Sequence, residues 1–121
     1  MADERAKRRL AAIAIADVVG YSRLMERDEA GTLSLLKERR EILLEPIVRG
    51  HEGRIVKFMG DGVLMEFASA VNAVEAALDL QEKMAEANTL LSEERRILLR
   101  IGINLGDIIG EGSDVYGTAS T

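Results

Sequence analysis

Two aspartates occupy positions where a side chain can bind a ligand instead of packing in the core. Asp17 follows an apolar run near the start of the chain, and Asp61 lies in a tight turn between Gly60 and Gly62. Taken alone, a carboxylate on a turn is more often a plain turn residue. Two carboxylates that meet beside a glycine-containing loop suit a divalent cation instead, because Mg²⁺ typically takes one or two carboxylates plus substrate phosphates. The elements that position Asp17 and Asp61 therefore decide between the two interpretations.

The sequence around each aspartate predicts β-structure. Residues 54–58 and 63–67 are predicted to form two short strands joined by a tight turn at residues 59–62. Glycine adopts the positive φ angles of such a turn without steric cost. Residues 10–16 are a short apolar run with isoleucines on one side and alanines on the other, which predicts a buried strand that ends just before Asp17.

Two helices and a last strand complete the pattern. Apolar residues at helical spacing predict a helix capped by Asp28 or Thr32 and running to about residue 49, with Pro46 expected to kink or shorten it. Ser69 is a good N-cap for a second helix that runs to about residue 88. Alternating apolar residues at 98–105 predict a strand, and the glycine-rich tail after it has no periodic pattern.

The element order is β-α-β-β-α-β, which predicts an α+β fold of the ferredoxin-like type. Right-handed crossovers give an antiparallel sheet with two helices on one face. In this topology the strands at 10–16 and 54–58 run in the same direction, and the strand at 63–67 lies between them. The end of the first strand and the turn at 59–62 then share one edge of the sheet. Asp17 and Asp61 are therefore expected to converge.

Apolar side chains fall on both faces of the predicted hairpin. Simple alternation sets Ile55 on one face against Val56 and Phe58 on the other, and Val63 against Leu64. A sheet face that carries apolar groups is usually covered. We expect later chain or a partner subunit to cover the face away from the helices.

Composition excludes several classes of protein. The 121 residues carry a formal net charge of −5, so no basic excess is available to bind nucleic acid in general. The absence of cysteine excludes a disulfide framework. No apolar run reaches the length of a membrane span, and the run after the charged lead-in at residues 1–9 is too short for a signal peptide. These features predict one cytoplasmic domain without membrane insertion. His51, the one histidine of the sequence, is interpreted as a capping or surface residue rather than a catalytic base.

Four segments in order resemble a known family. They read ADVVGYS at residues 16–22, GRIVKFMGDG at 53–62, RIGINLG at 100–106 and DVYG at 114–117. Together they resemble the class III nucleotidyl cyclase catalytic domain over residues 10–117, with the motifs suitably spaced. The resemblance implies an adenylate cyclase, which converts ATP into 3′,5′-cyclic AMP and pyrophosphate.

The resemblance also implies a metal site. Asp17, Asp61 and the carbonyl of Val18 would hold two divalent ions, Mg²⁺ or Mn²⁺. One ion would lower the pKa of the ribose 3′-hydroxyl that attacks the α-phosphate, and the other would bind the triphosphate and stabilise the leaving pyrophosphate. The loop that follows is expected to bind phosphate oxygens through its backbone N–H groups, and its residues are Val19, Gly20, Tyr21 and Ser22.

Base recognition follows from the same resemblance. Lys57 matches the lysine that reads the base in this family, and Asp114 matches its partner aspartate. An ammonium can donate to a ring nitrogen of adenine and a carboxylate can accept from its exocyclic amine, whereas guanine presents the opposite pattern, so ATP is expected over GTP. The family forms head-to-tail dimers with active sites at the interface, which implies a homodimer here.

The sequence departs from the family at its end. The family continues with an Asn and an Arg that orient the ribose and stabilise the transition state, but residues 118–121 do not match that helix. We therefore expect residues 10–121 to be a cyclase domain incomplete at its C-terminus, and the 121-residue chain to make little or no cyclic AMP. Alternatives are a catalytically silent regulatory or dimerisation module, and a guanylate or diguanylate cyclase. Lys57 with Asp114, and the absence of Gly-Gly-Asp-Glu-Phe at the turn, favour an adenylate cyclase.

Overall fold

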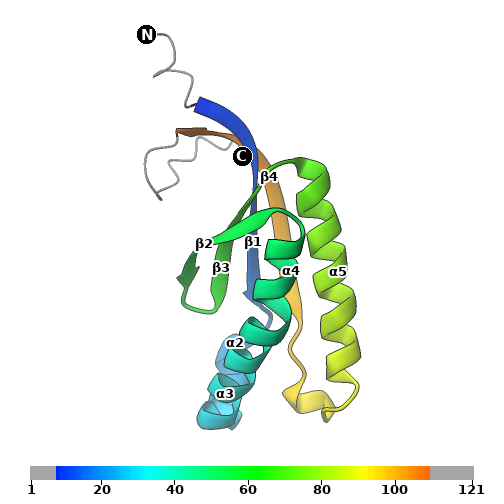
Figure 1. Ribbon diagram of the computed structural model, residues 1–121. Helices are drawn as coiled ribbons and strands as arrows, with labels where there is room; N and C mark the ends of the chain where they lie inside the picture. The colour runs from blue at the N-terminus through cyan, green and yellow to red at the C-terminus, as the bar shows by residue number, and fades with distance from the viewer. Residues whose placement is uncertain (1–7, 110–121) are drawn as a thin grey trace.

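A computed structural model describes residues 8–109, which form one four-stranded sheet with helices packed on it. Every neighbouring pair of strands is antiparallel, in the order β2-β3-β1-β4 (Figure 1). The strands are β1 (Arg8–Val18), β2 (Gly53–Met59), β3 (Gly62–Phe67) and β4 (Leu99–Ile109). The α+β fold with an antiparallel sheet is confirmed.

The helices lie on one side of this sheet (Figure 1). In chain order they are α2 (Tyr21–Arg27), α3 (Glu29–Arg39), the π-helical turn η1 (Arg40–Leu44), α4 (Glu45–Gly50), α5 (Ala70–Asn88) and the 3₁₀ turn η2 (Glu93–Arg95). Two predicted caps are confirmed. The Asp28 side chain accepts from the Gly31 N–H at 3.0 Å and starts α3, and the Ser69 hydroxyl accepts from the Asn72 N–H at 3.0 Å and starts α5.

The predicted single helix from residue 28 to 49 is wrong in detail. It is divided into α3, the wider η1 turn and α4, with Pro46 near the start of α4. Proline has no N–H to donate and its ring crowds the carbonyl four residues earlier. A π-helical turn directly before Pro46 shifts those partners, so the chain stays helical instead of stopping.

Three predicted boundaries also change. Residues 17–22 were predicted as a strand end that turns into a loop, but the loop is only Val19 and Gly20, because β1 continues to Val18 and α2 begins at Tyr21 after Gly20, whose φ of 68° turns the chain. Strand β1 begins at Arg8, inside the predicted lead-in, and β4 continues to Ile109. Both strands are longer because β4 pairs with β1 along its whole length, from Arg8↔Ile109 to Val18↔Leu99.

The main core lies between the sheet and the helices. Alternate residues of β1 and β3 face the helices, and all of them are buried: Ala12, Ala14, Ala16, Val63, Met65 and Phe67. The alanines leave room for α5, whose own buried residues include Ala73, Leu80 and Met84. Ala76 is buried on the same face of α5, and Ala77 next to it is half-buried.

A β-bulge in β2 sets which side chains share a face. The register shifts between Ile55 and Lys57, so Phe58 pairs with Val63 while Lys57 pairs with Leu64. Phe58 consequently lies on the same face as Ile55, and the prediction that these two residues point in opposite directions is wrong. The bulge has a second effect, because it turns Lys57 away from the helices.

The face of the sheet turned away from the helices is called the helix-free face below. Residues that pair across neighbouring strands point to the same face, and the pairing assigns the following residues to the helix-free face: Arg54, Lys57, Leu64, Glu66, Ile13, Ile15, Asp17, Arg100, Gly102 and Asn104. Apolar side chains do occur on this face, as predicted. Ile13 is buried with Leu64 beside it, whereas Ile15 is 44% exposed. Glu66 is also buried, and its carboxylate accepts from the Arg54 guanidinium at 3.0 Å.

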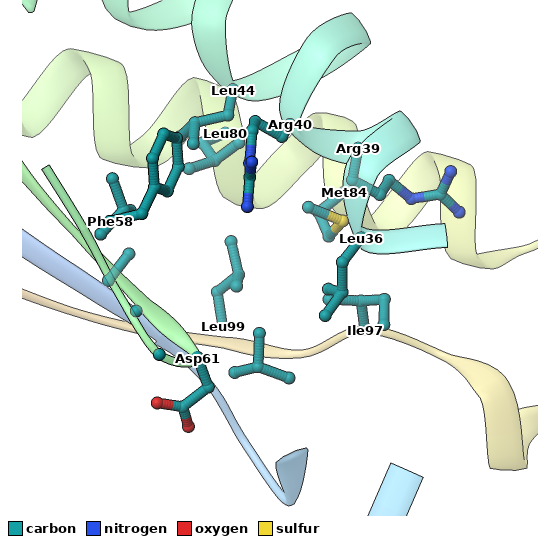
Figure 2. Close-up of a pocket in the computed structure, with 15 residues that line it drawn as sticks. Leu36, Arg39, Arg40, Leu44, Phe58, Asp61, Leu80, Met84, Ile97 and Leu99 are labelled. Atoms are coloured by element: carbon teal, nitrogen blue, oxygen red, sulfur yellow. The ribbon is translucent and has the colours of Figure 1, made fainter. Parts of the chain in front are cut away.

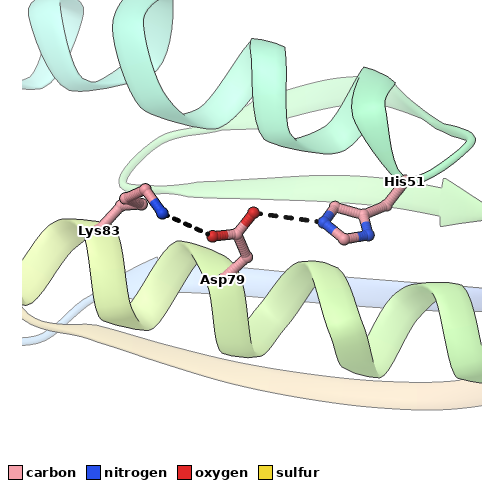
Figure 3. A network of polar contacts seen from close by, with 3 residues as sticks. All are labelled: His51, Asp79 and Lys83. Carbon is pink, nitrogen blue, oxygen red and sulfur yellow. Dashed lines mark hydrogen bonds and ion pairs between the residues drawn. The ribbon is translucent and has the colours of Figure 1, made fainter.

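His51 lies at the C-terminal end of α4 and is half-buried, in agreement with its predicted position at a helix end. Its Nε2 is 3.3 Å from a carboxylate oxygen of Asp79, and Lys83 donates to the other oxygen at 3.2 Å (Figure 3). These contacts tie the end of α4 to the middle of α5, on the opposite side of the sheet from Asp17.

Candidate functional site

Asp17 and the turn that carries Asp61 meet at one edge of the sheet. Asp17 pairs with Gly62, the residue after Asp61, and the Val18 N–H donates to the Asp61 carbonyl at 3.2 Å. Glycine suits position 62 at this contact, because a Cβ there would stand only 3.0 Å from the Ala16 carbonyl oxygen. The prediction that the end of the first strand and the turn of Asp61 share one edge of the sheet is therefore confirmed.

Arg100 forms an ion pair with Asp17 that was not anticipated from the sequence. Its guanidinium donates to the two carboxylate oxygens at 3.2 and 3.4 Å. The Asp17 side chain is 34% exposed and that of Arg100 is 73% exposed, so solvent screens the pair. Arg100 lies in the RIGINLG segment, but only the pairing Asp17↔Arg100 shows that it faces the carboxylate.

Some backbone N–H groups in the segment after Asp17 already donate to carbonyls within the chain. The Val19 N–H donates to the Leu98 carbonyl at 2.8 Å, and the Val18 N–H is already bonded to the Asp61 turn. Tyr21 packs against the core and Ser22 is exposed. Phosphate binding by Val19, Gly20, Tyr21 and Ser22 stays a prediction, and for Val19 it requires that the bond to Leu98 be given up.

Lys57 is exposed on the helix-free face, the same face as Asp17. Strand β3 lies between the strands that carry them, and neighbouring strands are about 4.8 Å apart. Lys57 therefore shares a surface with Asp17 without lying next to it. Asp114, its predicted partner, lies outside the described residues, as does the DVYG segment.

The donor set fits a hard divalent cation that brings other ligands with it. Among residues 8–109 no group of three or more His, Cys, Asp or Glu side chains could hold a metal ion. Two carboxylates at a partly exposed edge suit Mg²⁺ or Mn²⁺ bound with phosphate and water oxygens, and they do not suit a closed structural zinc site. The cation next to Asp17, Arg100, is exposed and can move away.

Sequence comparison decides the family. The chain is 61% identical over 117 residues to putative adenylate cyclase 3 of Rhizobium meliloti (strain 1021), a match that covers 97% of this chain and 20% of that protein. It is 39% identical over 116 residues to an adenylate cyclase of Streptomyces coelicolor, covering 96% of this chain and 29% of that one. The chain belongs to the class III nucleotidyl cyclase family.

Structural comparison agrees with this cyclase assignment. A crystal structure of an adenylate/guanylate cyclase/hydrolase from Silicibacter pomeroyi matches with a TM-score of 0.82 and 44% identity, over 91% of this chain and 64% of that chain. A bacterial light-regulated adenylyl cyclase matches with a TM-score of 0.74 at 20% identity, which supports the fold alone. No protein-family model matches the sequence.

The chain spans less than a third of the length of each of the two curated relatives named above. The activity, substrates and partners of those whole proteins therefore do not transfer to it directly. No helix within the described part of the chain is long and apolar enough to cross a membrane.

Proposed function

We propose that this chain is part of the catalytic domain of an adenylate cyclase that converts ATP into cyclic AMP and pyrophosphate with two divalent metal ions. The observation that supports it most is the pairing of Asp17 with Gly62, which brings two carboxylates to one exposed edge of the sheet. The relatives named adenylate cyclase support the same activity.

Asp17 and Asp61, with the carbonyl of Val18, are the proposed ligands. When bound, the metal ions supply a lowered pKa for the ribose 3′-hydroxyl and neutralise charge on the triphosphate. The chain's own contribution is to fix the backbone that carries both carboxylates, because β1 pairs on both sides at Asp17 and the Asp61 carbonyl accepts from the Val18 N–H. Such preorganised charge needs no rearrangement as the reaction proceeds.

Arg100 has to leave Asp17 when a cation binds there, since a guanidinium and a metal ion would compete for the same oxygens. The released guanidinium would then be available to pair with negatively charged triphosphate oxygens in place of Asp17. Arg100 is exposed and its ion pair is solvent-screened, so the exchange costs little.

Lys57 and Asp114 are the proposed residues that select adenine. The position of Lys57 supports a site shared between two subunits, because β3 separates it from Asp17 in its own protomer. In a head-to-tail homodimer, the Lys57 of one protomer would lie across from the Asp17 of the other. The exposed Ile15, next to Leu64 on the helix-free face, gives this surface an apolar centre of the kind that interfaces bury.

The test uses the purified chain and a chimera that appends the segment following the matched region in the Rhizobium meliloti relative. We expect the chimera to form cyclic AMP from ATP with Mn²⁺ and to form little cyclic GMP from GTP. The 121-residue chain should turn over at least about 10³-fold more slowly, because it lacks the arginine that stabilises the transition-state charge.

Two outcomes would contradict the proposal. Equal turnover by the chain and the chimera would show that the missing Asn and Arg are not needed. A chimera that folds, binds Mn²⁺ with ATP and still forms no cyclic AMP would favour a silent regulatory module instead. The same assay with Asp61→Asn in the chimera is the negative control.

A further inference from the structure

A cavity lies on the helix side of the sheet, directly behind the turn that carries Asp61. Its volume is about 90 Å³, and its walls come from the end of β1, α3 and η1, the β2–β3 hairpin, α5 and the start of β4. Most lining side chains are apolar, among them Leu36, Phe58, Leu80 and Leu99. The cavity borders the metal edge, because Val18 and Asp61 both line it, but the Asp61 carboxylate points away from Arg40 (Figure 2).

Arg40 is the charged group that stands over this cavity. Its side chain extends from η1 toward the hairpin, and its guanidinium carbon lies 3.9 Å from the centre of the Phe58 ring (Figure 2). Stacking uses the flat face of the guanidinium and leaves its N–H groups, which point from the edge, available. Arg40 has no ion-pair partner among the described residues.

A second donor in the wall also lacks a partner. Arg39 lines the cavity, its side chain is 11% exposed, and its Nε has no hydrogen-bond partner among the described residues. Its outer nitrogens are turned away, one toward the Ala87 carbonyl at 3.5 Å. A buried donor without a partner costs free energy that a bound acceptor would recover.

We propose that this cavity is a binding site for a small carboxylate with a short apolar tail. The carboxylate pairs with the free edge of the Arg40 guanidinium, whose fork of donors matches it in a bidentate fashion. The tail fills the apolar space between Leu36, Phe58 and Leu99. The cavity of about 90 Å³ is smaller than the roughly 150 Å³ that holds benzene, so a tail of about three or four carbons matches it.

The chemistry of the walls favours a carboxylate over phosphate. A phosphate ion carries more charge and needs several donors around it, whereas most of the lining here is apolar. The binding claim does not depend on the proposed cyclase activity.

The experiment follows binding of isovalerate to the full chain by NMR, using the resonances of Phe58 and of the Leu99 methyl groups. We expect saturable shifts with a dissociation constant on the order of 1 mM. Acetate lacks the tail and 3-methyl-1-butanol lacks the charge, so each should bind at least about tenfold more weakly.

Variants separate the two halves of the site. Arg40→Gln removes the cation and Leu36→Phe fills the space, and each should weaken isovalerate binding at least about tenfold. Lys37→Gln, which removes a neighbouring exposed cation outside the cavity, should leave it unchanged. Absence of saturable shifts, equal binding of the alcohol, or wild-type affinity in Arg40→Gln would each overturn the proposal. If Leu36→Phe does not fold, the ligand series and Arg40→Gln still decide it.

Discussion

The two faces of the same four strands perform different tasks. On the helix-covered face, Ala14, Met65 and Phe67 are at most 2% exposed and belong to the apolar core. On the helix-free face, the ion pairs Arg54–Glu66 and Arg100–Asp17 stand at 3.0 and 3.2 Å. The pleat of a strand separates these tasks, because successive residues point to opposite faces. Stability and ligand chemistry should therefore respond to different substitutions one residue apart.

The largest expected effect is on the helix-covered face. Phe67→Ala removes a buried ring and leaves a cavity, so it should lower the free energy of unfolding by about 3–5 kcal/mol. Urea denaturation measures this loss directly. Val71→Ala, at a residue that is 64% exposed on α5, is the control and should change stability little. A loss below 1 kcal/mol for Phe67→Ala would mean that this face does not hold the fold together.

The next effect concerns base selection on the helix-free face. In the intact protein, Lys57→Glu combined with Asp114→Ser should lower the ATP/GTP ratio of kcat/KM on the order of 100-fold, because buried hydrogen bonds to the base are lost. The free energy of unfolding should stay nearly the same, since Lys57 is exposed. Lys37→Glu, on the helix side, controls for the change of charge. An unchanged ratio would show that the base-reading assignment is wrong.

Arg100 offers a smaller and more specific test. Arg100→Gln removes the cation that competes for Asp17, so Mn²⁺ without nucleotide should bind about two- to fivefold more tightly, the range expected of a solvent-screened ion pair. Nucleotide triphosphate should bind more weakly to the same variant. Arg49→Gln removes an exposed arginine from α4 and should change neither affinity. Tighter triphosphate binding in Arg100→Gln would contradict the proposed exchange of partners.

The smallest effect lies in the contacts of Asp79 on α5. Hydrogen bonds from His51 first, and from Lys83 second, hold the pKa of Asp79 below its usual 3.8. A lowered pKa means that the ionised carboxylate contributes stability above pH 3.8, and that this contribution disappears as pH falls below 3.8. The Tm of Asp79→Asn should lie slightly below that of the wild type at neutral pH and meet it in acid. A difference in Tm that persists in acid would point to packing instead.

How much could be predicted from the sequence depends on how local each signal is. The caps at Asp28 and Ser69 were predictable because a cap needs only the residues next to it. The meeting of Asp17 with the Asp61 turn was predictable because it follows from topology alone. The side to which Lys57 points was not, since it depends on a bulge that no residue type marks.

Two further features could not be predicted for related reasons. The ion pair between Arg100 and Asp17 depends on the register between β1 and β4, and a one-residue slip would turn Arg100 to the other face. The η1 turn depends on how a helix accommodates Pro46, which can equally kink or end it.

The most direct test of the central claim is the binding of Mn²⁺ to the chain in the presence of ATP, measured by the loss of the free-ion signal in electron paramagnetic resonance. We predict that Asp17→Asn and Asp61→Asn each lower the affinity for Mn²⁺ at least about tenfold, because each substitution removes one of the two charged ligands. Glu82→Gln, an exposed carboxylate on α5, should bind as the wild type does. Wild-type Mn²⁺ affinity in either aspartate variant would contradict the claim that these two carboxylates form one metal site.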